Sequence, residues 1–424
     1  MKIVYRYRRT LTIYAAILLT LILFTTCITN QNKQQASEET TSSQPRLIDS
    51  IHYQKFAGSQ VCLKCHATIT RDYFHTAHFY TSQSANERSV IGSFKSLNNF
   101  FRYDEDRMVK LQKTDSGLYQ VYYYKGVEKV RRRFDIVIGS GKRGQTYLSW
   151  VGNQLIELPV SYFTEVHQWA NSPGYPLYPT LFNRPATTRC LECHSTFAAT
   201  LTAPMQEPEK FDSAKMILGV GCEKCHGPAA QHVTFETQHP NDTVGMFILN
   251  PAKLSRQLSI DVCALCHYGR LAKKQPSFQF IAGDTLSNYF FINANASDVS
   301  MIDVHGNQLG LLQASKCFQL SKTITCVTCH DAHKNEEGRT ALFSQRCMKC
   351  HTEQHKAVAG ISNNDLIKNC IDCHMPLQTS RSISFLLQDK TEPVNATMRT
   401  HYITIYNDET KKFIAHNNSK KGNL

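Results

Sequence analysis

The sequence predicts a mainly α-helical fold with irregular loops, into which one small antiparallel β-sheet is inserted. Three observations lead to this prediction. A short cysteine motif occurs seven times, its later copies follow one another at short intervals, and the long gap between the first two copies alternates apolar with polar residues. We therefore expect strands in that gap and short helical or irregular segments after residue 190.

The bulk composition is that of a globular protein. The 424 residues are enough for two or three domains, and they are 42% hydrophobic and 19% charged. A mean hydropathy of −0.35 gives no indication of a protein with many membrane spans. The formal net charge of +13 raises the question of a nucleic-acid partner, which the cysteines help to answer.

The recurring motif is CxxCH. Its copies are CLKCH (62–66), CLECH (190–194), CEKCH (222–226), CALCH (263–267), CVTCH (326–330), CMKCH (347–351) and CIDCH (370–374). CxxCH is the attachment signature of c-type haem, in which the cysteines form thioethers with one ring and the histidine binds its iron. Zinc ribbons, disulfides and redox CxxC motifs are the alternatives, but none of them requires the histidine.

Seven covalently bound haems are therefore predicted. The predicted attachment residues are Cys62, Cys65, Cys190, Cys193, Cys222, Cys225, Cys263, Cys266, Cys326, Cys329, Cys347, Cys350, Cys370 and Cys373. The predicted proximal ligands are His66, His194, His226, His267, His330, His351 and His374. Each haem brings two propionates, so seven add about fourteen negative charges, which match the basic side chains and argue against nucleic acid as a partner.

The N-terminus has the pattern of an export signal. A basic start precedes the apolar run 11–24, which is short for a membrane-spanning helix and ends at Cys27. We expect residues 1–27 to be a signal peptide with a site resembling a lipobox, and Cys27 to be lipidated. The residues Phe24-Thr25-Thr26 depart from the usual lipobox, so an ordinary signal peptide or an uncleaved anchor remains an alternative.

Residues 28–55 are mostly polar and are expected to form a flexible tether to the folded body. Haem is attached to CxxCH outside the cytoplasm, which agrees with an export signal. We therefore expect an exported protein on the periplasmic side of a bacterial membrane, held there by an N-terminal lipid.

The inserted sheet is expected within 94–165. Stretch 108–163 alternates β-branched and aromatic with polar residues, and glycine turns divide it into about five antiparallel strands. The stretch GSGKRGQT (139–146) is similar to a phosphate-binding loop, but Arg143 follows the lysine and a strand follows the turn. A β-turn is the better interpretation.

The remaining organisation follows the motifs. We expect a first haem segment (56–93), a haem-dense helical core (166–386) and a C-terminal segment (387–424). The last three motifs lie within 326–374, so their rings must be near neighbours. The expected fold is a multihaem cytochrome c core built around stacked haems.

Longer stretches around the motifs resemble a known family. GSQVCLKCH with HTAHFYTS, GVGCEKCHGPAAQHV, TCVTCHDAH with CMKCHTEQH, and CIDCHMP are similar to multihaem cytochromes of the cytochrome c-554-like, doubled-CxxCH type. IGSGKRGQTYLSW, LPVSYF and NSPGY resemble its larger, bacterial lipoprotein-like members. The resemblance covers about 58–405 and implies electron transfer through closely stacked haems, usually ligated by two histidines.

Eleven further histidines could supply distal ligands. His78, His232, His333 and His355 fall on the family's motifs, and His401, His305 and His75 are further distal candidates. His167 and His239 are weaker candidates, and His52 and His416 are expected to bind nothing. Met301 and Met348 are the rival ligands, with core packing as their ordinary role. Cys317 is expected to be a buried thiol.

His333 follows the proximal His330 by three residues. So short a segment cannot cross from one face of a covalently held ring to the other. We therefore expect His333 to bind the iron of a neighbouring haem, and His355, four residues after His351, to do the same.

Two functions fit these features. An electron carrier between extracytoplasmic redox partner proteins is favoured, tethered to the membrane by its lipid. The alternative is a multihaem oxidoreductase acting on a small nitrogen or sulfur compound at one open-coordination haem. The lysine-ligated CxxCK motif of pentahaem nitrite reductases is absent, which weakens one version of the enzyme.

Overall fold

The protein contains nearly as much strand as helix, which corrects the predicted fold class. The computed structural model describes residues 51–421 except 179–181, 205, 293–297, 353–357 and 389. The chain is 29% helical and 25% strand, so the prediction of a mainly α fold is wrong. Strands occupy a longer stretch than the predicted insertion, and three more two-stranded sheets lie between or after the motifs.

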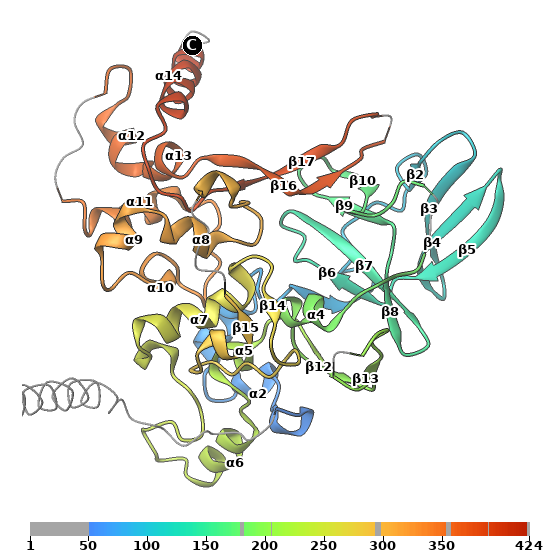
Figure 1. Cartoon of the computed structure of the whole chain (residues 1–424), viewed down its shortest axis with the longest axis horizontal. Helices are drawn as coiled ribbons and strands as arrows, with labels where there is room; N and C mark the ends of the chain where they lie inside the picture. The colour runs from blue at the N-terminus through green and yellow to red at the C-terminus, as the bar shows by residue number, and fades with distance from the viewer. Residues whose placement is uncertain are drawn as a thin grey trace, which may run out of the picture. The chain divides into compact units, whose positions relative to one another are not determined.

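The stretch between the first two motifs forms two antiparallel sheets (Figure 1). The four-stranded sheet has the order β2-β3-β4-β5, with β2 Phe100–Arg102, β3 Arg107–Thr114, β4 Gly117–Tyr124 and β5 Val127–Arg133. The seven-stranded sheet follows β1-β6-β7-β8-β11, with β9 paired to β7 and β10 paired to β9. Its strands are β1 Ser82–Ser84, β6 Ile136–Ile138, β7 Gly144–Val151, β8 Gln154–Glu157, β9 Val160–Phe163, β10 Gln168–Asn171 and β11 Arg184–Pro185.

The turns of these sheets follow the expected chemistry. Between β4 and β5, Lys125 and Gly126 have φ values of 51° and 76°, the positive values that a two-residue hairpin of type I′ requires. Residues 139–143 form the connection from β6 into β7, and a strand rather than a helix follows them, which argues against a phosphate-binding loop.

Aromatic side chains fill the space between the strands. The Phe134 and Tyr147 rings stack with centroids 4.4 Å apart, and Trp169 packs against both. Gly92 lies so close to the Trp169 ring that no Cβ would fit there. The β-region therefore has a conventional side-chain core of its own.

Short helices carry the seven motifs. They are α2 Ser59–Cys62, α4 Thr188–His194, α5 Cys222–His226, α7 Arg256–His267, α10 Cys326–Cys329, α11 Thr340–Met348 and α13 Cys370–His374. The other helices are α3 Ala67–Tyr73, α6 Ala230–Gln238, α8 Gln308–Gln313, α9 Lys316–Leu320, α12 Asn363–Lys368 and α14 Asn407–Lys421. Most are too short to be stable alone and depend on their packing partners.

Three hairpins interrupt this part of the chain. They are β12 Ser195–Thr200 with β13 Phe211–Leu218, β14 Ala272–Lys273 with β15 Phe290–Phe291, and β16 Leu377–Phe385 with β17 Val394–Arg399. The last hairpin reaches back to the β-region, where the Phe385 ring stacks on Phe163 with centroids 3.7 Å apart (Figure 1). It thereby links the segment after the seventh motif to β9.

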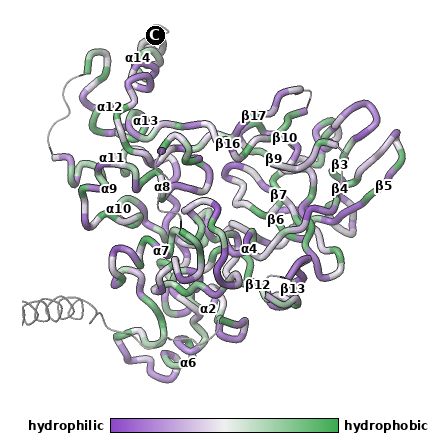
Figure 2. The backbone as a smooth tube through the Cα atoms, viewed as in Figure 1, coloured by the Kyte–Doolittle hydropathy of each residue, from purple (hydrophilic) through white to green (hydrophobic). Residues whose placement is uncertain are grey.

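Figure 2 shows hydrophobic and hydrophilic residues interspersed along the described chain. Within residues 51–421, apart from the gaps given above, no helix is both long enough and apolar enough to cross a bilayer.

Candidate haem-binding sites

A single helical turn brings the residues of a motif together. The backbone amide of His66 donates to the Cys62 carbonyl at 2.8 Å, and that of His330 donates to the Cys326 carbonyl at 3.0 Å. These bonds close one α-helical turn, so both cysteines and the histidine of a motif face the same side. Two thioethers and one axial ligand on the same ring require this arrangement.

The thiols are available for such attachment. All fourteen motif cysteines are free, and so is Cys317, which is half-buried. In the described part of the chain, no three or more His, Cys, Asp or Glu side chains gather into a metal-binding cluster.

The first and third motifs are packed against each other. The amide of Cys222 donates to Ser59 Oγ at 3.1 Å, which joins α5 to α2. The Glu223 carboxylate, only 3% exposed, accepts three backbone amides, those of Ala57, Gly58 and Ala229, each at 2.8 Å. One side chain of the third motif thus fastens the start of the first haem segment.

The second and fourth motifs meet in the same way. Arg189 Nη2 donates to the Leu265 carbonyl at 2.9 Å, and Cys193 Sγ donates to the same oxygen at 3.9 Å. A hydrogen bond with Cys266 lowers the pKa of the Cys193 thiol to about 7, and the charges of Arg189 and Lys224 act in the same direction. The side chains of motifs 2, 3 and 4 therefore converge here.

The last three motifs form a third group. Arg346 Nη1 donates to the Cys329 carbonyl at 2.7 Å, and the Arg346 guanidinium also binds both carboxylate oxygens of Glu336 at 2.7 and 2.5 Å. The amide of Cys370 donates to Ser344 Oγ at 3.0 Å. Motif 6 is thereby held between motifs 5 and 7.

Three proximal histidines face a second imidazole from a distant segment. The ring centroids are 6.1 Å apart for His226 and His333, 6.0 Å for His330 and His401, and 6.1 Å for His78 and His267. The first two pairs are nearly parallel, with interplanar angles of 27° and 26°, whereas the third is at 83°. No pair joins a motif to the histidine that directly follows it.

These separations fit two ligands of one iron. Imidazole nitrogens lie about 2 Å from a bound metal, and each nitrogen is about 1 Å from its ring centre. Two rings on opposite sides of one metal should then have centres roughly 6 Å apart. The residues present therefore fit haem c with two axial histidines at the third, fourth and fifth motifs.

Burial favours the neutral form, which metal ligation needs, in five imidazoles of these pairs, namely those of His78, His226, His267, His330 and His401. Desolvation lowers the pKa of His267 to about 4, with His78 contributing, and lowers that of His401 to about 4, with His330 contributing. Desolvation also lowers the pKa values of His78, His194, His226, His305 and His330. A proton therefore competes weakly for these nitrogens near neutral pH.

Backbone carbonyls orient several of the rings. The Nδ1 atoms of His226, His232 and His374 donate to the carbonyls of Leu249, Met246 and Thr404 at 2.8, 2.7 and 2.8 Å. A carbonyl can only accept, so Nδ1 carries the proton, and Nε2 is then the nitrogen that would bind a metal, as is usual for metal-ligating histidines.

Among the described residues, none of the remaining candidates forms a ring contact with a proximal histidine. His305 lies near His194 and contributes to lowering its pKa after desolvation. Met301 is 70% exposed and His52 bonds only to the neighbouring Gln54 at 3.2 Å. His75, His167 and His239 are exposed, Met348 is half-buried, and His355 and the side chain of His416 lie outside the described residues.

Sequence reasoning missed the acidic and basic side chains inside and beside the motifs. Glu223, Arg189 and Arg346 join motif to motif through backbone groups, yet CxxCH constrains neither its x positions, where Glu223 lies, nor the position before it, where Arg189 and Arg346 lie. A charged residue within a motif is the only signal that the sequence offers.

Comparisons with known proteins point to one kind of protein. A family model described as "Cytochrome c554 and c-prime" matches residues 180–227, which hold the second and third motifs. The C-type polyheme cytochrome OmcC of Geobacter sulfurreducens is 26% identical over 206 residues. That match covers 44% of this chain but only 26% of OmcC, so the chain corresponds to about a quarter of that relative's length.

One solved structure has a related fold. The outer cell wall cytochrome OcwA aligns with a TM-score of 0.52 and 15% identity, over 84% of this chain and 81% of OcwA. An undecaheme cytochrome from the S-layer of Carboxydothermus ferrireducens aligns with a TM-score of 0.38 and 15% identity, over 85% of this chain and 53% of its own.

Proposed function

We propose that this chain, which is a multihaem c-type cytochrome, binds seven covalent haems and carries electrons between redox partner proteins outside the cytoplasm. Haem c supplies centres that take up and release one electron at a time. The chain supplies the attachment, the axial ligands and the fixed spacing of the sites.

The observation that carries the proposal is the set of three facing imidazole pairs. Each pair joins a proximal histidine to a histidine elsewhere in the chain, at 6.0 to 6.1 Å between ring centres. Two strong axial ligands leave no position for a substrate, which favours electron transfer over catalysis at these sites. We propose His78, His333 and His401 as the distal ligands of the fourth, third and fifth motifs.

The contacts between motifs support the same role. Amide and guanidinium hydrogen bonds fasten motif 1 to motif 3, motif 2 to motif 4, and motif 6 to motifs 5 and 7. Such bonds hold neighbouring sites at fixed distances without a mobile element. A fixed close spacing is what electron exchange between sites requires, whereas binding and releasing a substrate requires access.

The haem count is the first test. We expect the intact mass of the exported protein to exceed that of its polypeptide by about 4.3 kDa, because seven haems of about 616 Da each are held by thioethers. A zinc protein would lose its metal in acid and show no porphyrin absorbance. Five or fewer haems in a fully matured sample would contradict the predicted count.

Protein-film voltammetry on the same sample tests the function itself. Reversible electron uptake over several centres, unchanged by nitrite or sulfite, is the result expected of a carrier. A catalytic current with either compound would favour the oxidoreductase alternative.

Lipid anchoring is proposed from the apolar run that ends at Cys27, which lies outside the described residues. We expect Cys27→Ser to prevent lipidation, so that the protein appears in the soluble periplasmic fraction or stays as an uncleaved precursor. Fractionation with and without detergent measures this. Wild-type protein that is already soluble without detergent would rule out the lipid anchor.

A further inference from the structure

Three motifs carry lysine at the same position, directly before the second cysteine. These residues are Lys64, Lys224 and Lys349. Lys64 and Lys349 are exposed, whereas Lys224 is half-buried. The same residue at the same place in the motif therefore has two different environments.

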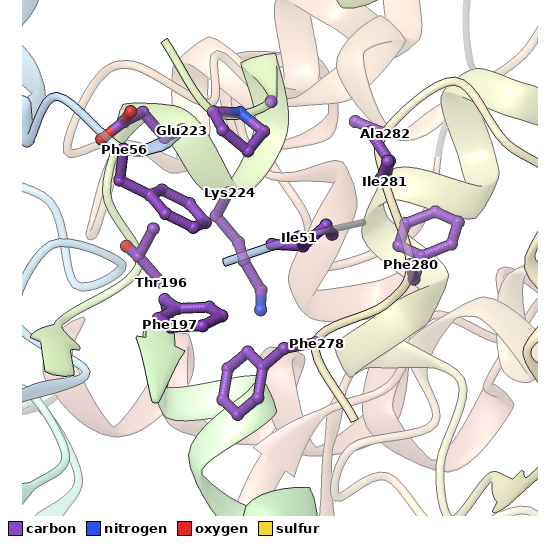
Figure 3. A pocket seen from close by; sticks show the side chains of 12 residues that line it. Ile51, Phe56, Thr196, Phe197, Glu223, Lys224, Phe278, Phe280, Ile281 and Ala282 are labelled. Carbon is purple, nitrogen blue, oxygen red and sulfur yellow. The ribbon is translucent and has the colours of Figure 1, made fainter. Parts of the chain in front are cut away.

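Lys224 points into an aromatic pocket (Figure 3). Phe56, Phe197 and Phe278 line this pocket, and the Lys224 ammonium lies 4.8 Å from the centroid of the Phe278 ring. A cation over an aromatic face is held by the ring's quadrupole, and the attraction increases when water is displaced. The pocket thus holds a positive charge beside the second and third motifs.

The charges around Lys224 do not neutralise it. The adjacent Glu223 faces the other way and is occupied by three backbone amides. Glu192 in motif 2 is 1% exposed, pairs with Arg189 at 3.3 Å and accepts the Phe278 amide at 2.6 Å. Among the described residues, the Lys224 ammonium forms no ion pair with a carboxylate.

The same pocket places this charge beside motif 2. Thr196 and Phe197, which lie just after motif 2, line the pocket. Phe278, whose ring the ammonium faces, donates its backbone amide to Glu192 of motif 2 at 2.6 Å. One ammonium therefore lies beside motif 2 as well as within its own motif 3.

We infer that Lys224 is a tuning residue that raises the reduction potentials of the sites at motifs 2 and 3. Reduction adds one electron to a site, and a partly desolvated positive charge nearby favours the added negative charge. Lys64 and Lys349 face water, which screens their charges. The inference rests on the proposed electron-transfer function. It adds a reason why two sites have higher reduction potentials than they would have without Lys224.

The test is a redox titration of the oxidised protein, followed by optical and electron paramagnetic resonance spectra. Lys224→Met keeps the length of the side chain but removes its charge. We expect the reduction equilibria of two sites to become less favourable by about tenfold each. Lys64→Met and Lys349→Met make the same change at the same position of their motifs. Both variants should show the reduction equilibria of the wild type within the error of the titration.

Lys224→Arg serves as the rescue, because it keeps the charge over the Phe278 ring, and it should restore the wild-type titration. Titration curves of Lys224→Met that coincide with wild type would overturn the inference, and so would an equal shift in Lys64→Met. Conversion of one site to high spin would identify Lys224 as an iron ligand and overturn it as well. Absence of reversible electron uptake in the wild type would instead count against the proposed function.

Discussion

Replacing His333 with alanine should convert one low-spin six-coordinate site into a high-spin or water-ligated site, and the affected site should be that of motif 3. His333 faces His226 with ring centroids 6.1 Å apart and an interplanar angle of 27°. It makes no such contact with His330, its neighbour in the sequence. The buried Tyr73 supports His333 edge-on at 6.2 Å between centroids, so the ring is held from both sides.

Electron paramagnetic resonance of the oxidised protein measures this change. All haems should remain attached in His333→Ala, because attachment uses only the cysteines, and the intact mass should fall only by the difference between the two side chains. His52→Ala is the matched control, since His52 contacts only Gln54 and should leave the spectrum unchanged. A fully low-spin spectrum of His333→Ala would show that His333 is not an iron ligand.

Replacing Glu223 with alanine should lower the free energy of unfolding more than replacing any other Asp or Glu residue described above. Its carboxylate is 3% exposed and accepts the amides of Ala57, Gly58 and Ala229. Each amide left without a partner costs roughly 1–3 kcal/mol. We therefore expect the free energy of unfolding to fall by roughly 3 kcal/mol or more, and the segment before Ser59 to detach from motif 3.

Chemical denaturation of the haem-loaded protein measures the change in stability, and proteolysis near residues 57–58 reports local detachment. Glu128→Ala is the control, because Glu128 is exposed and its ion pair with Arg131 at 2.8 Å is screened by water, so its loss should leave the stability nearly unchanged. If the two variants unfold at the same denaturant concentration, the three hydrogen bonds from backbone amides to Glu223 are not what joins motifs 1 and 3.

The sequence alone predicts the local geometry of each motif, but it does not predict which distant histidine faces the proximal histidine of that motif. The spacing of Cys62, Cys65 and His66 predicts one helical turn, because that geometry depends on neighbouring residues alone. The partner of His226 cannot be predicted in this way, since His333 reaches it only through the folding of the intervening chain. His78, His333 and His401 could be selected as candidates, but not assigned to their sites.

The error in fold class has a similar cause. Haem-dense segments were expected to be helical, yet 377–385 and 394–399 form a hairpin whose Phe385 packs on Phe163 of the β-region. That contact spans more than two hundred residues of sequence. Strand propensity depends strongly on such packing partners, and a local pattern does not reveal them.

The position of His401 has a consequence for how the protein is made. His330 belongs to the fifth motif, but the imidazole that faces it lies beyond the seventh, at the far end of the β16–β17 hairpin. Ser315 holds this end in place: its Oγ donates to the His401 carbonyl at 3.0 Å and accepts the Ile403 amide at 2.7 Å. In the proposed export the N-terminus emerges first, so the fifth site would lack its facing imidazole until nearly the whole chain had crossed. His78, by contrast, would cross before Cys263. A nascent chain that stalled after the last motif would therefore contain every attachment cysteine, while the fifth site still lacked His401.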